Sequence, residues 1–306
     1  MMWLIGSKGM LGQELAVLLE KKNMPFIGTG REVDVTDGKA LEDFAKNREA
    51  PFRWIINCAA YTAVDKAEDD AETCRRLNSL GAANIAACAK SIGARMIHIS
   101  TDYVFDGKGI TITGTDVLRP YREDDETNPS GVYGLTKRDG ELAVMENNPR
   151  SSIIRTAWLY GKYGNNFVHT MLRFMQERDE VKVVNDQRGT PTWTKDLASV
   201  IITLIEKTKA VPSPSGVYHF TNMGECTWFD FAQAIYAEGR KLGILTKECQ
   251  ILPCTSDQFP AKVKRPLYSV LDKSKISAAL NITIPFWKES LRNFLFEVKD
   301  AYQKAN

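Results

Sequence analysis

A tyrosine and a lysine with acid/base potential open a helical pattern near the middle of the chain. Tyr133 and Lys137 stand four residues apart in a pattern that runs to Val144, and this spacing places both side chains on one helix face. A free phenol titrates near pH ~10, and a neighbouring cation favours the phenolate, so Lys137 should lower the pKa of Tyr133. That change would suit acid/base catalysis. An ordinary surface pair has the same spacing.

A threonine that could share this chemistry follows an apolar run. Residues Arg95 to Ile99 predict a buried strand that ends in Ser100 and Thr101. In open α/β sheets the carboxyl ends of the strands hold the ligand. We therefore predict that Thr101, Tyr133 and Lys137 form a catalytic set, in which Thr101 hydrogen-bonds the substrate oxygen.

Three glycines near the amino terminus predict a nucleotide site. A short strand from Met2 to Ile5 precedes them, and a helical pattern follows. Glycines allow a tight turn and a close approach to a pyrophosphate, which the amino terminus of the helix faces. A plain glycine-rich turn is the alternative. The residues expected to bind the cofactor here are Gly6, Gly9, Met10, Leu11 and Gly12.

Later segments extend the predicted cofactor site. Arg31 follows the second strand, where an arginine accommodates the 2′-phosphate of NADP and an acidic residue binds the ribose of NAD; Glu32 comes next. The third strand, from Trp54, ends in Ala59 and Ala60, whose small side chains would let a flat cofactor lie across the sheet edge. Tight helix packing would favour them too. Asn78 is either a surface amide or a residue behind the active site.

Composition limits the classes of partner. The 306 residues include 40 basic and 38 acidic side chains, and the net charge of +2 is spread along the chain, which argues against a nucleic-acid polymer or a membrane as partner. The six cysteines form no C-x-x-C pair, so we expect reduced thiols. The amino terminus lacks the basic and apolar pattern of a signal peptide. These features predict a cytoplasmic protein.

The order of expected elements predicts the fold. Five alternations of strand and helix in the first half indicate an α/β, doubly wound parallel sheet of the Rossmann type, with a smaller C-terminal α/β substrate domain. We expect residues 1–155, with 185–221 returning to them, to bind the cofactor, and residues 156–184 and 222–306 to bind the substrate. A long polar loop from Asp106 to Pro129 joins the two halves of the catalytic set, and such loops are normally functional or mobile.

Several motifs together resemble a known family. The chain resembles the extended short-chain dehydrogenase/reductase superfamily and, within it, the dTDP-4-dehydrorhamnose reductase family, over essentially its whole length. The motifs that carry this resemblance are Gly6, Gly9 and Gly12, Asn57 to Thr62, Ser100 to Gly107, Val132 to Lys137, Arg155 to Gly161, Asn166 to Val168, Asp186 to Thr192, Gly216 to His219, Arg265 with Pro266, and Ser269 to Asp272.

The resemblance implies an activity and a set of residue roles. It implies reduction of the C4 keto group of dTDP-4-dehydro-6-deoxy-L-mannose to dTDP-L-rhamnose with NADPH or NADH. Tyr133 would protonate the developing alkoxide, and Lys137 would hold the nicotinamide ribose. A homodimer is a further expectation, whereas no metal is predicted. The residues implied for substrate are Val104, Trp158, Asn166 and Arg188, and those implied for cofactor also include Asp34, Val35, Tyr61 and Asn78.

Other functions remain open at this point. A 4,6-dehydratase needs a carboxylate pair after the threonine, and Tyr103 stands beside Asp102 where the second carboxylate would be. An epimerase, or a reductase of another dTDP-4-keto sugar, would use the same fold. A non-catalytic regulatory subunit that resembles the methionine adenosyltransferase beta subunit is the alternative from another class, and it would need neither Tyr133 nor Lys137.

Overall fold

A six-stranded parallel sheet organises the protein. The computed structural model describes residues 1–207, 215–259 and 261–303. The strand order is β12-β7-β4-β3-β1-β2, and all neighbouring pairs are parallel. Because the order changes direction between β1 and β3, their carboxyl ends form the crevice where such folds bind ligands. The strands are β1 (Met2–Ile5), β2 (Phe26–Thr29), β3 (Trp54–Asn57), β4 (Arg95–Thr101), β7 (Ser152–Thr156) and β12 (Gly216–His219).

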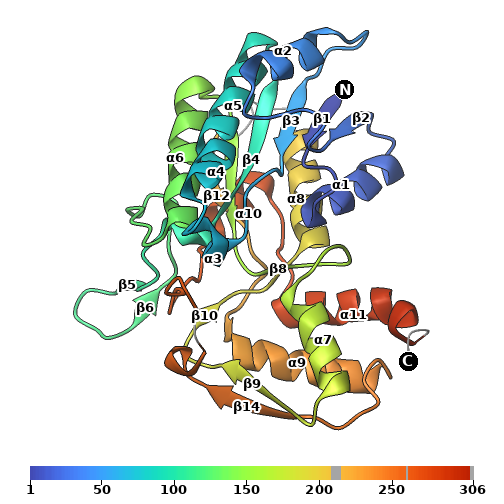
Figure 1. Cartoon of the computed structure of the whole chain (residues 1–306), viewed down its shortest axis with the longest axis vertical. Helices are drawn as coiled ribbons and strands as arrows, with labels where there is room; N and C mark the ends of the chain where they lie inside the picture. The colour runs from blue at the N-terminus through green and yellow to red at the C-terminus, as the bar shows by residue number, and fades with distance from the viewer. Residues whose placement is uncertain (208–214, 260, 304–306) are drawn as a thin grey trace.

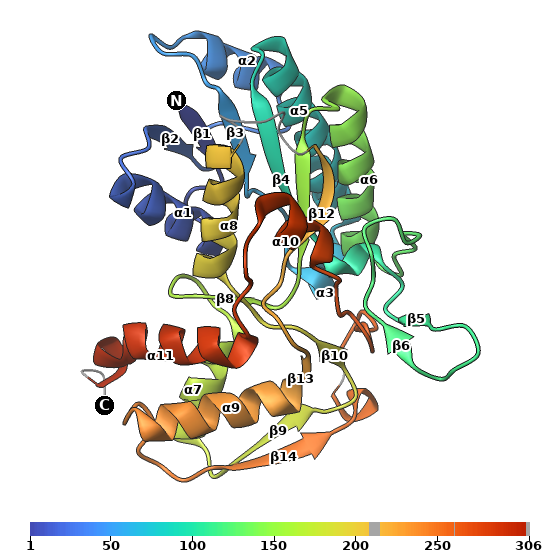
Figure 2. The same ribbon diagram turned by 180° about the vertical axis from the view of Figure 1, so that it is seen from behind.

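Helices cover both faces of this sheet (Figures 1 and 2). Side chains alternate along each strand, so Met2 and Leu4 pack into one buried cluster and Trp3 and Ile5 into another. The predicted doubly wound α/β fold is confirmed. The first face is covered by α1 (Met10–Lys21), α8 (Thr194–Lys207) and α10 (Ser274–Leu280), and the second by α2 (Gly38–Lys46), α5 (Gly81–Ser91) and α6 (Val132–Asn147).

A second group of elements lies below the carboxyl edge of the sheet in Figure 1. Its own apolar cluster is centred on side chains such as Phe231, Trp287 and Phe294. Its strands β9 (Glu180–Val184) and β14 (Gln250–Cys254) pair in parallel. Its helices are α7 (Phe167–Glu177), α9 (Trp228–Lys241) and α11 (Trp287–Gln303), and short pairs join β8 (Leu159–Tyr160) to β11 (Thr192–Trp193) and β10 (Arg188–Gly189) to β13 (Cys226–Thr227).

Several short helices occupy residues 63–93, where the sequence has a long helical pattern with a break near Ala71. The chain forms α3 (Val64–Ala67) and α4 (Ala71–Arg75), then a π-helical turn over Arg76–Leu80 that leads into α5. Such turns are rare and occur frequently at functional sites. This turn contains Asn78.

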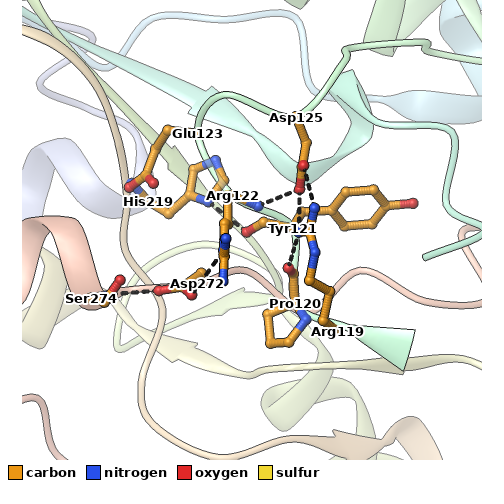
Figure 3. A network of polar contacts seen from close by, with 9 residues as sticks. All are labelled: Arg119, Pro120, Tyr121, Arg122, Glu123, Asp125, His219, Asp272 and Ser274. Carbon is orange, nitrogen blue, oxygen red and sulfur yellow. Dashed lines mark hydrogen bonds and ion pairs between the residues drawn. The ribbon is translucent and has the colours of Figure 1, made fainter. Parts of the chain in front are cut away.

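Hydrogen bonds anchor the long loop after β4. A 3-10 turn (Asp102–Val104) precedes the projecting hairpin of β5 (Ile110–Thr111) and β6 (Leu118–Arg119). Figure 3 shows the network beyond the hairpin, in which Arg119 donates two hydrogen bonds to Asp125, at 2.7 and 2.6 Å. The His219 backbone N–H donates to the Glu123 carboxylate, and the His219 ring contacts the Tyr121 carbonyl oxygen. These bonds fix the path that leads into α6.

Candidate active site

Two predicted catalytic residues, Thr101 and Tyr133, meet at the carboxyl edge of the sheet. Thr101 ends β4, and its hydroxyl donates to the Asp102 carboxylate at 3.0 Å and accepts from the Tyr103 N–H at 3.2 Å. Tyr133 lies in the first turn of α6, where its ring meets the Tyr103 ring edge-on at 5.5 Å. A hydrogen bond between Thr101 and Tyr133 lowers the pKa of Tyr133.

Lys137 is held inside the protein. Lys137 is 1% exposed. Its Nζ donates to the Ile99 carbonyl oxygen at 2.7 Å and lies 3.3 Å from His98 Nε2. Burial is the largest cause that lowers its pKa, to about 8. An ammonium in this place loses its hydration, so the neutral amine is favoured relative to a lysine in water.

The predicted lowering of the Tyr133 pKa is wrong for this structure. Burial, the largest cause, raises this pKa above its usual value. The hydrogen bond with Thr101 lowers it, and Asp102, Tyr103 and Cys74 raise it further. Lys137 is not among these causes. At neutral pH Tyr133 is therefore a protonated phenol, as a free tyrosine is, and burial makes it a weaker acid than a free tyrosine.

The glycine turn fits a dinucleotide. Gly6 has φ +78°, and a Cβ there would lie 2.7 Å from the Ala59 backbone nitrogen; a Cβ on Gly12 would lie 2.2 Å from the Gly6 carbonyl oxygen. The turn therefore has room only for glycine, at the crevice between β1 and β3. The helix α1 starts at Met10, so the N–H groups of its first turn are directed at this crevice. The Leu11 side chain packs into the core instead.

The loop after β3 is shaped by two buried amides. Asn57 accepts a hydrogen bond from the Ala59 N–H at 3.0 Å. Asn78 accepts from the Tyr61 N–H at 2.8 Å and donates to the Tyr61 carbonyl oxygen at 3.1 Å. Because Asn78 is 1% exposed, the interpretation as a surface amide is wrong. Asn78 holds the loop of Ala59, Ala60 and Tyr61 in place.

The residues at the end of β2 are more open. Arg31 is exposed, and Lys8 forms an exposed ion pair with Glu32 at 3.4 Å. Asp34 accepts from the Thr36 N–H and hydroxyl, and these bonds lower its pKa. Val35 packs into the core. Arg31 and Lys8 are thus the accessible cations at this end of the site.

The four predicted substrate residues differ in access. The Val104 side chain is fully buried, and Asn166 caps α7 by accepting from the His169 N–H. Arg188 is exposed and ion-paired to Glu225 at 2.8 Å. Trp158 is partly exposed and has a left-handed φ of +48°, which is a strained conformation often found at functional sites. Of the four, Trp158 and Arg188 have the more accessible side chains.

A cavity of about 1280 Å³ lies beside this site. Arg265 lines it and also hydrogen-bonds Tyr103, whose ring contacts Tyr133. Trp228 lines it too and stacks on Trp158 with ring centroids 3.6 Å apart. Sequence reasoning missed most of the lining. The principal aromatic and basic side chains are Phe167, Phe174, Trp228, Arg178, Lys182, Lys262, Lys264 and Arg265, and Asp65, Glu180, Asp186 and Asp257 also line the cavity.

One signal in the sequence pointed to this cavity. Lys262, Lys264 and Arg265 form a basic run directly before Pro266. In the structure, Lys262 pairs with Asp69, and Arg265 pairs with Asp65. No comparable sequence pattern marks Phe174 or Arg178, because aromatic residues in helices and basic residues at helix ends occur on any protein surface.

Two absences complete the description of the site. Among residues 1–207, 215–259 and 261–303, no group of three or more metal-ligating side chains lies together. In the same ranges, no helix is both long and apolar enough to cross a membrane.

The sheet, the glycine turn at its switch point and the Thr-Tyr-Lys set define a nicotinamide-dependent oxidoreductase of the extended short-chain dehydrogenase/reductase type. Residues 1–299 match the family model described as RmlD substrate binding domain. The chain is 42% identical over 293 residues to a dTDP-4-dehydrorhamnose reductase of Streptomyces griseus, covering 94% of this chain and 91% of that protein. It therefore belongs to the dTDP-4-dehydrorhamnose reductase family.

Two further relatives bear on substrate and cofactor. The dTDP-4-keto-6-deoxy-D-glucose reductase of Streptomyces niveus is 38% identical, with 94% of each chain covered. The structure of the dTDP-4-dehydrorhamnose reductase of Bacillus anthracis str. Ames in complex with NADP matches with a TM-score of 0.87 and 35% identity, covering 97% of this chain and 98% of that one.

Proposed function

We propose that this chain reduces the C4 keto group of dTDP-4-dehydro-6-deoxy-L-mannose to give dTDP-L-rhamnose, with NADPH or NADH as cofactor. The observation that carries the proposal is the contact of the Tyr133 phenol with Thr101 at the sheet edge. The Tyr133 ring also meets Tyr103, which hydrogen-bonds Arg265 in the lining of the large cavity. Membership of the reductase family indicates that the substrate is this sugar nucleotide.

The reduced cofactor supplies a hydride to the sugar C4. The protein supplies orientation and a proton. As negative charge develops on the substrate oxygen, Tyr133 donates its proton to it, and its raised pKa means that the proton is present throughout the neutral range. Thr101, already bonded to Asp102, orients the phenol from the strand end. Lys137, whose Nζ donates to the Ile99 carbonyl oxygen, would hold the nicotinamide ribose when the cofactor is bound.

The exposed cations at the end of β2 support a preference for NADPH. Arg31 and Lys8 lie where the 2′-phosphate of NADP binds in such folds. The Lys8 to Glu32 pair is exposed and therefore weak, so a phosphate can replace Glu32 as the partner of Lys8.

The cavity supports the binding of a nucleoside diphosphate sugar. Phe167 and Trp228 offer flat faces to the base, while Arg178, Lys182 and Lys264 offer charge to the diphosphate. We propose that residues 156–184 and 222–306 form this substrate domain and that residues 1–155 and 185–221 form the cofactor domain. The separate apolar clusters support that division; α10, which packs on the sheet, is an exception within it.

A second candidate is a reductase of another dTDP-4-keto sugar. The Streptomyces niveus relative, at 38% identity, is named for such a substrate. The two candidates differ in which stereoisomer enters the cavity and in the configuration of the product. A regulatory subunit without catalysis would have no use for a buried Lys137 and a protonated Tyr133.

The test is NADPH and NADH oxidation with enzymatically prepared dTDP-4-dehydro-6-deoxy-L-mannose, with the product identified by NMR. Tyr133→Phe should lower kcat by a factor of roughly 10² to 10⁴, as loss of a general acid does. Tyr236→Phe, which removes a hydroxyl bonded to the Cys249 N–H, is the matched control and should keep wild-type activity. Turnover of only the 6-deoxy-D-glucose isomer would establish the second candidate instead.

A cytoplasmic location and a homodimer belong to the same proposal. All six cysteines are free thiols, which suits a reducing compartment. Exposed apolar side chains such as Phe296 and Phe286 offer surface for self-association. Fractionation of cells and sedimentation of the purified protein test these two points.

A further inference from the structure

Trp158 has a backbone conformation that a tryptophan rarely adopts. Its φ is +48°, and in the part of the chain that the structure describes, the other non-glycine residues with positive φ are Asn23 and Asn281. Asparagine enters the left-handed region readily, whereas a bulky side chain there is strained. Such strain persists only where the surroundings hold the residue in place, so the contacts of Trp158 are of interest.

Contacts on three sides hold Trp158. Its carbonyl oxygen accepts a hydrogen bond from the Thr192 N–H at 3.1 Å. One edge of its indole lies against Gly189, where an added Cβ would be 2.6 Å from Trp158 Cε2. One face of the indole stacks on Trp228, with ring centroids 3.6 Å apart and an angle of 10° between the planes. The stack is the contact that replacement of a side chain can remove.

Trp228 is itself held firmly. It begins α9, whose N-cap is Thr227. The Thr227 hydroxyl accepts from the Asp230 N–H at 3.1 Å, and the Asp230 carboxylate accepts from the Thr227 N–H at 2.9 Å, a capping box that fixes the first turn. Phe167, at the start of α7, packs against the Trp228 ring with centroids 4.5 Å apart. Trp228 can therefore serve as a rigid support for Trp158.

Trp158 connects the catalytic edge of the sheet with the large cavity. It follows the end of β7, where Thr156 pairs with Thr101 on β4, and its stacking partner Trp228 lines the cavity. The next step rests on the proposed reductase function. If the nucleotide lies in the cavity and the keto carbon reaches Tyr133, the sugar between them passes Trp158.

An indole suits the apolar side of a deoxy sugar. A 6-deoxy sugar carries a methyl group and C–H bonds that an aromatic ring can cover. Trp228 covers one face of Trp158, which is still partly exposed. We propose that Trp228 is a positioning residue: through the stack it holds Trp158 in its left-handed conformation and thereby fixes the wall against which the keto sugar lies.

The first test is the conformation of Trp158 in crystal structures of two variants. Trp228→Leu keeps an apolar side chain but removes the flat ring, whereas Trp228→Phe keeps a ring that can stack. Trp158 should leave its left-handed φ in Trp228→Leu and keep it in Trp228→Phe. A Trp158 that stays in place in Trp228→Leu would overturn the proposal. These structures need no substrate, so they stand apart from failure of the proposed function.

The second test separates a positioning role from direct contact with the nucleotide. It measures the affinities for dTDP-L-rhamnose and for dTDP by calorimetry in the presence of NADP⁺. A ring that only stacks on the base affects both ligands equally, whereas a ring that positions the sugar wall affects only the sugar nucleotide. Trp228→Leu should lower the ratio of the two affinities about 10-fold, as loss of an aromatic contact does, and Trp228→Phe should restore most of it.

A double-mutant cycle completes the second test. If Trp228 acts through Trp158, Trp228→Leu should not lower the ratio further in the Trp158→Ala background. Phe174→Ala is the matched control, because Phe174 lines the same cavity but packs on Arg178; it should change both affinities by the same factor. An equal loss for both ligands in Trp228→Leu, or a further loss in the Trp158→Ala background, would overturn the proposal.

The wild-type protein shows which idea has failed. If it binds dTDP-L-rhamnose no better than dTDP, the proposed substrate is wrong and the sugar wall with it. The crystal structures of the two Trp228 variants then still decide whether Trp228 holds Trp158 in its left-handed conformation.

Discussion

The contact between Gly12 and the turn before it makes a sharp prediction. In Gly12→Ala, the new Cβ would lie 2.2 Å from the Gly6 carbonyl oxygen and 2.8 Å from the Ser7 Cα. Both are backbone atoms, so no side chain can rotate away. The glycine turn and the start of α1 would have to separate by about 1 Å to reach ordinary van der Waals contact.

The cost in stability should be small and the cost in function large. Overpacking costs about 1–3 kcal/mol, and alanine in place of glycine inside a helix returns up to about 1 kcal/mol. The net loss is therefore on the order of 0–2 kcal/mol, and the protein should fold. A displacement of about 1 Å at a site that positions reactants lowers kcat/KM on the order of 100-fold.

The assay pairs NADPH binding, followed by nicotinamide fluorescence, with thermal unfolding. Gly239→Ala is the matched control, because it makes the same replacement within a helix, α9, where the new Cβ would lie 3.0 Å from the Leu245 side chain and away from the glycine turn. We expect Gly12→Ala to bind NADPH far more weakly while Gly239→Ala binds it nearly as wild type does. If Gly12→Ala binds NADPH as tightly as wild type, the glycine turn is not the cofactor cradle.

Three further predictions concern charge and buried contacts. Arg31→Ala should reduce the ratio of kcat/KM for NADPH over NADH by about 10-fold or more, since a hydrogen bond to a charged group contributes about 1.5–3 kcal/mol; an unchanged ratio would exclude a role in 2′-phosphate binding. Glu141→Gln should destabilise the fold by about 3–5 kcal/mol in urea unfolding, because it leaves Arg155 buried without its carboxylate partner at 2.7 Å, and a loss below about 1 kcal/mol would contradict this. The pKa of Lys137 falls from 10.5 to about 8 on folding, so between these pH values the unfolded chain holds more protons than the folded one. The free energy of unfolding that this group contributes therefore rises with pH from about 8 to 10.5. Lys137→Met should lose that rise, and an equal rise in both proteins would refute the prediction.

The amino-acid pattern was enough to predict the elements that hold the site. Apolar runs marked β1, β3 and β4, and glycine spacing marked the turn before α1, because strands and tight turns are decided by neighbouring residues. The position of Thr101 at a strand end followed from the same pattern. The break before α4 was also visible.

The same patterns could not give the surroundings of each polar group. Asn78 could be a surface amide or a buried one, and only the packing of the π-helical turn on α6 decided that it holds Tyr61. The pKa of Tyr133 was predicted in the wrong direction, because the helix spacing shows that Lys137 is near but not that burial dominates. Burial depends on elements distant in sequence.

The sequence by itself determined the α/β fold, the glycine turn and the residue types of the catalytic set, since each depends on local spacing. Only the tertiary structure decided which charges are buried, which amide faces which ring, and where the cavity lies. Asn57, His98 and Lys137 come from three separate elements, and their hydrogen bonds exist only after the sheet has formed and α6 has packed against it. Contacts of that kind join residues far apart in the chain, so no local pattern specifies them.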